Sequence, residues 1–360
     1  MTSRQLRVLA AAAAVAVVPP GDAQIAPRTV ADCGSCPITT ARLFETTDND
    51  SALYMRPMSI IETADRKLVV ITRQMHADPP ALFDSTGRWI GWLGARGSGP
   101  GETSRPTWLR LLDDGGIRVY SPGRYNDFDA SGRYRTSHVF KTSSASTQVV
   151  FLPSGTIVAT PTWIAAGQTH VPLTARHADG SALSGSAADT PRVEFQSALG
   201  PAASGAAAAG RFWVAERVRA GSTRGLRLSR ITIDGNPDLV LEYAPPWWNR
   251  EVNVPGHGRQ DVPASVIAVR EDDNGRVWVL AARVPADADN QLAIAVATRN
   301  PNRPVEGALL VIDRQSARLV GEATIPGWPV ALLNDGRVAT YAERFTGEPY
   351  LTVWNASLPR

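Results

Sequence analysis

Asp114-Gly-Gly-Ile-Arg-Val-Tyr120 joins a polar turn to a short run of β-branched and aromatic residues. Aspartate and glycine suit tight hairpin turns, and isoleucine, valine and tyrosine favour strands. The pattern recurs along the chain in five further copies. These copies begin at Asp65, Ser154, Ala209, Asn274 and Asp335.

A second polar turn follows each of these first turns. The second turns are Phe83-Asp-Ser-Thr-Gly87, Phe128-Asp-Ala-Ser-Gly132, His177-Ala-Asp-Gly180, Ile233-Asp-Gly235, Ile312-Asp-Arg-Gln-Ser316 and Trp354-Asn-Ala-Ser357. Two turns per unit and six units predict an all-β fold, a six-bladed β-propeller with four-stranded blades. Because Asp-Gly and Asn-Gly suit two-residue hairpin loops, we expect that loop type at these corners.

Residues 1–23 have the pattern of a signal peptide. Arg4 and Arg7 precede an apolar stretch from Val8 to Val18, which is shorter than the about 20 residues that a membrane-spanning helix needs. An uncleaved anchor is the alternative, and Pro19-Pro20 disfavours it. We therefore expect an exported protein, periplasmic or extracellular.

The composition of the chain indicates which classes of partner are expected. The formal net charge is +3, and no run of basic residues is interleaved with aromatic ones, so nucleic acid is not expected as a partner. No segment after residue 23 is long and apolar enough to predict a membrane span. A hydrophobic content of 43% with ten tryptophans suits the many small cores of a propeller, and we expect a monomer.

Residues 24–56 form an N-terminal segment ahead of the propeller proper, which is predicted over 57–360. The sixth unit ends without an outer strand, and Ile38-Thr-Thr-Ala-Arg-Leu-Phe44 belongs to no other unit. Pairing this segment with the last blade would close the ring and remove an open sheet edge. We expect that closure.

Cys33 and Cys36 are the two cysteines of the chain. In an exported protein this pair predicts a local disulfide. A redox centre would need a βαβ context, and a zinc site would need further ligands nearby. Haem attachment would need histidine where Pro37 stands. The pair is therefore interpreted as structural.

Residues Gly94 to Phe140 carry a more specific pattern. It consists of Gly94-Ala-Arg-Gly-Ser-Gly-Pro-Gly-Glu102, Pro106, the Asp113-to-Tyr120 turn and strand, and Tyr125-Asn-Asp-Phe-Asp-Ala-Ser-Gly-Arg133. This stretch resembles one NHL-type repeat, in the form found in exported six-bladed bacterial propellers. It departs from the usual repeat at Tyr120-Ser121, where Ala-Asp is usual. The resemblance implies the fold and export, and no particular activity.

In a propeller, the outer-to-inner crossovers and the loops between the second and third strands share one face, around the channel mouth. Ligand-binding candidates on that face are Arg96, Glu102, Arg124, Trp163, Trp247 and Trp248, with Arg344 beside them. Two indoles next to Pro245-Pro246 could stack on a sugar or grip a peptide. They could equally cap the barrel and pack inward, and the sequence leaves both readings open.

Metal binding is the second hypothesis. Weak candidate ligands are His76, His170 and His257, which fall on loops of different blades. Six-bladed amidating lyases resemble this chain in fold and use a histidine-ligated zinc, but the histidine spacing here does not match. Gluconolactonase-like propellers use acidic and asparagine ligands, whereas Glu62 and Glu271 lie only near strand ends. Asp287, Asp289 and Asn290 could ligate calcium, although a solvated loop explains them better.

We therefore expect a non-enzymatic propeller without a cofactor. Its channel-mouth face is expected to bind a protein, peptide or glycan. The alternative is a metal-dependent hydrolase or lyase with zinc or calcium in the central channel. The sequence contains no nucleophile elbow, His-Glu-x-x-His motif or phosphate-binding loop to support a specific enzyme.

Overall fold

The structure is a computed structural model. It describes residues 25–47, 52–53, 56–72, 78–139, 146–151, 157–161, 170–172, 174–176, 192–194, 198–201, 209–220, 223–233, 236–254, 258–285 and 305–358. These residues form strands, turns and connecting segments, and none of them is helical. The predicted signal peptide lies outside the described residues.

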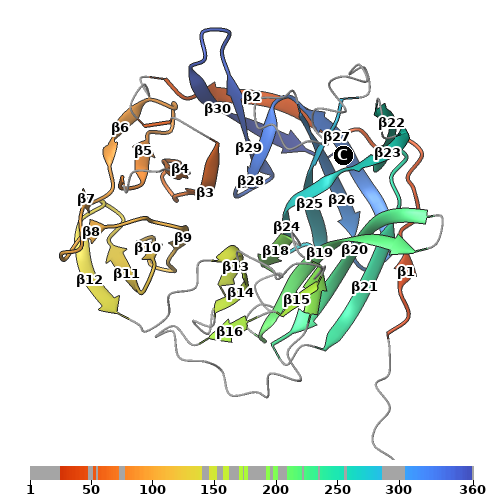
Figure 1. The fold of residues 1–360 in the computed structure, drawn as a ribbon, viewed down its shortest axis with the longest axis horizontal. Coiled ribbons are helices and arrows are strands. Elements are labelled where there is room, and N and C mark those ends of the chain that lie inside the picture. The colour runs from red at the N-terminus through yellow and green to blue at the C-terminus, as the bar shows by residue number, and fades with distance from the viewer. Residues whose placement is uncertain are drawn as a thin grey trace, which may run out of the picture.

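Radial sheets surround a common axis, with the first strand of each sheet innermost (Figure 1). Two sheets occupy the N-terminal half of the ring. The β3–β6 sheet comprises β3 (Pro57–Glu62), β4 (Leu68–Thr72), β5 (Ala81–Phe83) and β6 (Trp89–Trp92). The β9–β12 sheet comprises β9 (Trp108–Leu111), β10 (Ile117–Ser121), β11 (Arg124–Phe128) and β12 (Tyr134–Val139). A short parallel pair connects them, β7 (Ala95–Arg96) with β8 (Glu102–Thr103).

The middle of the chain forms a smaller sheet and a larger one. The smaller comprises β13 (Ser146–Phe151), β14 (Ile157–Pro161) and β16 (Thr174–Arg176), beside the pair β15 (His170–Pro172) and β17 (Arg192–Glu194). The larger comprises β18 (Ala198–Pro201), β19 (Arg211–Ala220), β20 (Thr223–Thr232) and β21 (Pro237–Tyr243), with β1 (Arg28–Thr29) as a fifth strand.

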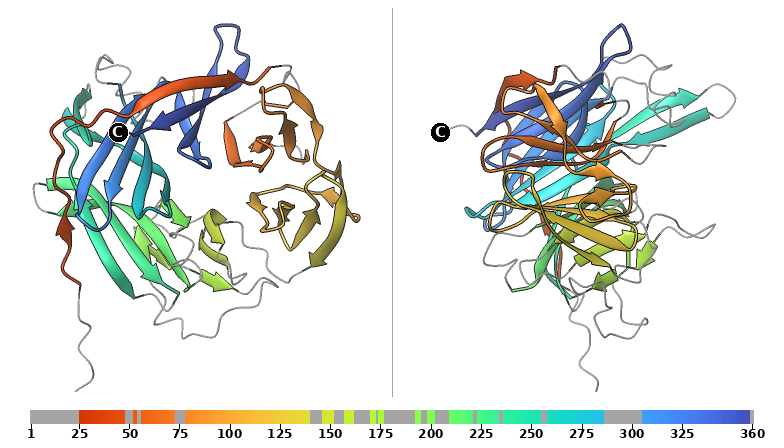
Figure 2. Two further views of the ribbon diagram at one scale, coloured as in Figure 1. Left: turned by 180° about the vertical axis from the view of Figure 1, so that it is seen from behind. Right: turned by 90° about the vertical axis from the view of Figure 1, so that its left-hand side faces the viewer.

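The C-terminal part forms two further four-stranded sheets. The β24–β27 sheet comprises β24 (Ser265–Glu271), β25 (Arg276–Arg283), β26 (Glu306–Asp313) and β27 (Arg318–Ile325). The last sheet comprises β28 (Trp328–Leu332), β29 (Arg337–Glu343), β30 (Pro349–Ser357) and β2 (Thr39–Glu45). A separate hairpin, β22 (Asn249–Val254) with β23 (Gly258–Pro263), projects from the ring between β21 and β24 (Figure 2).

This arrangement is a β-propeller. Five of its sheets have four or more strands and are complete blades, whereas the β13–β14–β16 sheet has three strands within the described residues. The all-β propeller prediction is therefore confirmed. Six complete four-stranded blades are not shown, and the third predicted blade accounts for the difference.

Side chains between neighbouring sheets form the core. Each sheet packs its apolar residues against the next, as Val69 and Ile71 of β4 do against Val119 and Phe128 of the following sheet. A fully buried aliphatic or aromatic side chain contributes about 1.5–3 kcal/mol, so these interfaces dominate the stability of the ring. The structure therefore has several separate apolar clusters between its sheets, as the sequence predicts.

The N-terminal segment is a strap across the outer edges of four sheets (Figure 2). We call residues 28–47 the strap. It runs parallel to β21 through β1, touches β27, pairs antiparallel with β30 through β2, and reaches β6 at Thr47. In the β2 ladder, Thr39 lies opposite Ser357 and Glu45 opposite Thr352. The predicted pairing of this segment with the last blade is therefore present.

The turn corners differ from the expected two-residue loops. In the turn that begins at Asp84, Gly87 donates to the Asp84 carbonyl at 3.0 Å, and Asp84 donates to the Arg88 carbonyl at 2.9 Å. Gly87 has φ +88°, so this is a type I turn closed by a left-handed glycine. The Asp84 carboxylate accepts the N–H groups of Thr86 and Arg88, which stabilises this wider loop.

The turn at Asp129 repeats this geometry with Gly132. Among the corners that the structure describes, Asp335-Gly336 keeps the predicted two-residue form. Both of its residues have positive φ, and Arg337 donates to the Asn334 carbonyl at 3.1 Å.

Gly87 offers a test of how closely the strap is seated. A Cβ at Gly87 would lie 2.5 Å from the Glu45 carbonyl oxygen in the strap, whereas at Gly132 the nearest atom would be Leu93 Cδ1 at 3.4 Å. Both glycines have a left-handed φ, which costs other residues about 1–2 kcal/mol. We expect Gly132→Ala to lower the free energy of unfolding by about 1–2 kcal/mol. Gly87→Ala should lower it by about 1–3 kcal/mol more, because the strap must move to make room for the new methyl group.

Urea unfolding of the two variants and the parent protein measures both losses. Equal losses for Gly87→Ala and Gly132→Ala would show that the strap does not press on this turn.

Candidate functional site

The two faces of the ring follow from strand direction. Each inner strand runs from the face that carries the crossovers to the face that carries its first turn corner. The first residues of β3 and β28 therefore lie on the crossover face, and their last residues lie on the corner face. The β22–β23 hairpin begins and ends at a crossover, because Ala264 donates to the Trp248 carbonyl at 2.8 Å and closes its base.

Four residues at the crossover ends of the last and first sheets form a polar and aromatic group. We call Arg56, Trp328, Tyr341 and Glu343 the crossover-face cluster. Arg56 directly precedes β3, and its guanidinium carbon lies 4.3 Å from the centre of the Trp328 ring. Trp328 and Tyr341 lie opposite one another in the β28–β29 ladder. Glu343 follows Tyr341 by two residues and ends β29. The cluster therefore bridges the two ends of the ring.

The chemistry of the cluster is set by two contacts. Stacking on an indole holds the Arg56 guanidinium flat and is worth about 0.5–2 kcal/mol. The Tyr341 hydroxyl donates to Glu343 Oε1 at 2.7 Å. Burial raises the pKa of Tyr341, and the hydrogen bond to the Glu343 carboxylate raises it further, so the hydroxyl stays protonated and remains a donor.

The cluster combines charged and aromatic groups of the kind that recognise ligands. Arg56 and Trp328 are partly exposed, Glu343 is exposed, and Tyr341 is buried. A cation, an anion and an indole edge therefore lie together on one surface. Arg344, expected on this face, lies next to Glu343, stacks over Tyr350 at 5.0 Å, and pairs with Glu45 of the strap at 3.7 Å.

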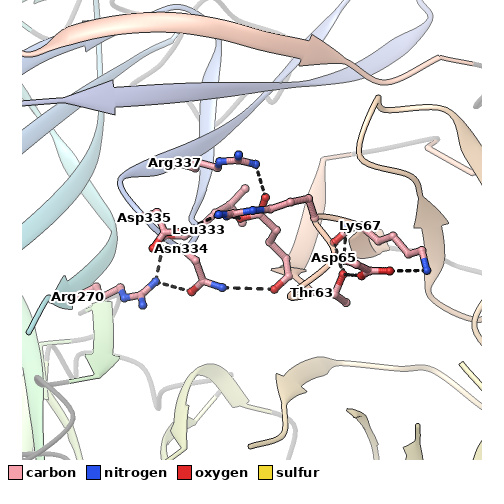
Figure 3. Close-up of polar contacts among 10 residues, drawn as sticks. Thr63, Asp65, Lys67, Arg270, Leu333, Asn334, Asp335 and Arg337 are labelled. Atoms are coloured by element: carbon pink, nitrogen blue, oxygen red, sulfur yellow. Dashed lines mark hydrogen bonds and ion pairs between the residues drawn. The ribbon is translucent and has the colours of Figure 1, made fainter. Parts of the chain in front are cut away.

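On the corner face a second polar network joins the same two sheets to the β24–β27 sheet (Figure 3). Arg337 donates to Glu62 Oε1 at 2.6 Å, and Arg66 bridges Glu62 to Asp335. Arg270 reaches the Asn334 side chain at 2.8 Å, as Figure 3 shows.

The Glu62 side chain is fully buried, and both of its oxygens are engaged by arginines. This network therefore holds the first, the last and the β24–β27 sheets together on the corner face. Glu62 and Glu271 end their inner strands and are both ion-paired.

Three of the predicted ligand-binding residues lie at the outer rim instead of around the axis. Arg96 and Glu102 belong to β7 and β8, which lie beside the outer strand β12 (Figure 1). Arg124 donates to the Gly99 carbonyl at 3.0 Å, and Glu102 accepts the Gly99 N–H at 2.7 Å. These contacts fold the glycine-rich crossover onto its own sheet, and ligand binding by the three residues stays a prediction.

The structure decides between the two readings that the sequence leaves open for the tryptophan pair. Trp248 is fully buried in the core between the β18–β21 and β24–β27 sheets. Trp247 is half-buried, donates to Glu322 Oε1 at 2.5 Å, and has the Arg283 guanidinium 4.9 Å from its ring centre. The inward-packing reading, which the sequence left open, is the one found, because the loop closes the gap between two sheets.

The side chains of the remaining candidate binding and metal-ligating residues are not described by the structure. His76, Trp163, His257, Asp287, Asp289 and Asn290 lie outside the described residues, and His170 is placed only as a residue of β15. Among the side chains that are described, no three His, Cys, Asp or Glu residues come close enough together to hold a metal ion. The metal hypothesis stays a prediction.

The predicted Cys33–Cys36 disulfide is present in the strap. Sequence reasoning missed all four residues of the crossover-face cluster. A signal existed for two of them, because Arg56 stands directly before a predicted inner strand and Trp328 begins another. Their proximity depends on the first and last blades being neighbours, which the predicted closure implies.

Comparison with known proteins assigns neither a family nor an activity. No known family profile matches the sequence, and no curated protein matches it either. A candidate exported protein from Bacteroides fragilis is 10% identical over 90% of this chain and 96% of its own, with a TM-score of 0.48.

Two further solved structures are similar in the same way. The Pan2 WD40 domain from Neurospora crassa is 9% identical over 89% of this chain and 96% of its own, with a TM-score of 0.44. A gluconolactonase from Xanthomonas campestris is 14% identical over 93% of this chain and 98% of its own, with a TM-score of 0.41. A search of the described residues for helices able to cross a membrane finds none.

Proposed function

We propose that this protein is an exported, non-enzymatic propeller that binds a peptide segment of a partner protein through its crossover face. The observation that carries the proposal is the crossover-face cluster, in which Arg56 is stacked on Trp328 beside the Glu343 carboxylate. Peptides carry both charges and apolar groups, so paired opposite charges next to an indole suit a peptide better than a neutral sugar.

The surroundings of the cluster support a binding surface. The β22–β23 hairpin projects from the ring, and the β29–β30 connection places Phe345 fully exposed near Glu343 (Figure 2). Aromatic and arginine side chains carry most of the energy of many protein interfaces. A rigid ring with projecting hairpins therefore offers a preformed rim around the cluster.

The finer description of the fold belongs to the same proposal. We infer a six-bladed, NHL-like ring in which the β13–β14–β16 sheet is the third blade and β2 completes the last one. The six repeated turn corners and the β2–β30 pairing support it. Export is supported by the leader-like residues 1–23 and by the disulfide, which suits an oxidising compartment.

The experiment selects ligands from a random peptide library and a glycan panel, and then measures their affinities. We expect Arg56→Ala and Glu343→Gln each to weaken the selected peptide about tenfold or more, since an interface hot spot is worth about 2 kcal/mol. Arg135→Ala is the matched control, because Arg135 pairs with Asp114 on the corner face. A selected ligand whose affinity neither variant changes would contradict the proposal, as would failure of both libraries.

The metal-dependent hydrolase or lyase remains the alternative class. No contact among the described residues favours it over the binding module. Measurement of zinc and calcium in the purified protein, repeated with His76, His170 and His257 all changed to alanine, decides between the two. Stoichiometric metal that is lost in the variant would make the alternative the working answer.

A further inference from the structure

The strap leaves the outer strand β27 for a few residues and then returns to it. Ala31 exchanges hydrogen bonds with β27 at Ala317 and Leu319, both at 2.9 Å. Pairing resumes where Glu322 donates to the Cys36 carbonyl at 2.9 Å. The segment between is the loop that the Cys33–Cys36 disulfide closes.

The cause of this departure is a β-bulge in β27. In the β26–β27 ladder, Val311 lies opposite Gly321 and Ile312 opposite Leu319, so Val320 has no partner. A bulge interrupts the regular spacing of edge hydrogen bonds, so the strap cannot stay in register across it. The disulfide loop arches over this point instead.

A pocket of roughly 470 Å³ lies beneath the arch, a volume within the usual range of small-molecule sites. Strap, corner and outer strand all contribute to it. Its lining residues are Cys33, Cys36, Arg276, Asp313, Ser316, Arg318, Leu319, Val320 and Leu358. The pocket is at the outer rim, and it shares no residue with the crossover-face cluster.

The charge of the pocket is positive. Arg276 and Arg318 face one carboxylate, Asp313, which accepts both the Ser316 N–H and the Ser316 hydroxyl at 2.6 Å. The Ser316 hydrogen bonds, chiefly, and the charge of Arg276 hold the pKa of Asp313 below its usual value. Within the described part of the chain, neither arginine forms an ion pair of its own, so the pocket has more cationic than anionic groups.

The rest of the lining is apolar. Leu319 is buried, Val320 is half-buried, and Leu358 and the disulfide add further apolar surface. Two guanidinium groups can hold a carboxylate through charge-assisted hydrogen bonds, which are about twice as strong as neutral ones. The apolar wall then has room for a short hydrocarbon chain.

We propose that this pocket binds a small carboxylate with an apolar tail. The ligand carboxylate would lie between Arg276 and Arg318, and its tail would contact Leu319, Val320 and the disulfide. This site is separate from the proposed peptide-binding surface, and its test is independent of that proposal.

The test is a calorimetric titration of the full protein with hexanoate, hexan-1-ol and inorganic phosphate. We expect hexanoate to bind with a Kd of about 1 mM or tighter, and at least about tenfold more tightly than either comparison compound. Arg318→Gln and Arg276→Gln should each weaken hexanoate about tenfold. Arg88→Gln, at an exposed arginine in the turn before β6, should leave it unchanged.

Thermal melting of each variant controls for folding, and Arg318 is exposed, so Arg318→Gln should fold normally. Absence of hexanoate binding to the parent protein overturns the proposal, as does hexanoate binding to Arg318→Gln and Arg276→Gln as tight as to the parent. Phosphate binding as tightly as hexanoate overturns the ligand class, because the apolar wall would then contribute nothing.

Discussion

Glu271→Ala is expected to lower the free energy of unfolding by about 3–5 kcal/mol, because it leaves the half-buried Arg314 guanidinium and the buried Trp213 indole N–H without their partner. The Glu271 side chain is fully buried at the end of β24. It accepts the Trp213 indole N–H at 2.8 Å from the neighbouring sheet. Arg314 Nε lies 2.8 Å away as an ion pair, and Arg230 lies 4.0 Å away.

Urea unfolding measures the loss, and three companion variants separate its causes. Glu271→Gln keeps an oxygen for Trp213 and removes the charge, so its loss should be intermediate. The double variant Glu271→Leu with Arg314→Leu should recover part of the stability, since it leaves no unpaired Arg314 charge while the Trp213 N–H still lacks its acceptor. Glu45→Ala removes the partly exposed pairs with Arg42 and Arg344 and should cost less than about 1 kcal/mol. A Glu271→Ala loss as small as that of Glu45→Ala would contradict this account.

Trp248→Ala is expected to destabilise the protein by about 3–5 kcal/mol, the usual cost of removing a large buried aromatic side chain. Trp248 is completely buried between two sheets, and its backbone carbonyl closes the base of the β22–β23 hairpin. Trp247→Ala should cost less, because Trp247 is half-buried and loses mainly its contacts with Glu322 and Arg283.

Thermal or urea unfolding of both variants tests the inward packing of this loop. The account is contradicted if Trp248→Ala keeps the parent stability and weakens ligand binding, because that result would favour the exposed platform, the other reading that the sequence leaves open. Peptide affinity for Trp247→Ala should stay within about threefold of the parent, since the indole is committed to Glu322.

The sequence predicts the architecture well because propeller corners depend on local chemistry. Asp84, Asp129 and Gly336 form turns because of their own side-chain and backbone preferences, which can be read from a few neighbouring residues. The β-branched residues between the turns favour strands in the same local way. The predicted two-residue loop is wrong at Asp84 and Asp129. Each of these carboxylates accepts two backbone N–H groups, and these hydrogen bonds favour the wider turn.

The candidate site was harder to predict, since it depends on contacts between residues distant in sequence. Arg56 and Trp328 are adjacent only because the ring brings the first and last sheets together. The sequence leaves open whether Trp247 and Trp248 are exposed, and the inward packing depends on the neighbouring sheet, which supplies the half-buried Glu322 as a partner. Arg124 begins β11 on the expected face, but it contacts a glycine-rich crossover that lies against the outer strand β12.

The most direct measurement of the central claim is hydrogen–deuterium exchange of the protein with and without the tightest peptide selected from the library. The account predicts slower exchange in the segments that contain Arg56, Trp328 and Tyr341 to Glu343, at the crossover face. Protection confined to the corner-face turn at Asn334 to Arg337, or to the outer-rim crossover at Gly94 to Glu102, would contradict it.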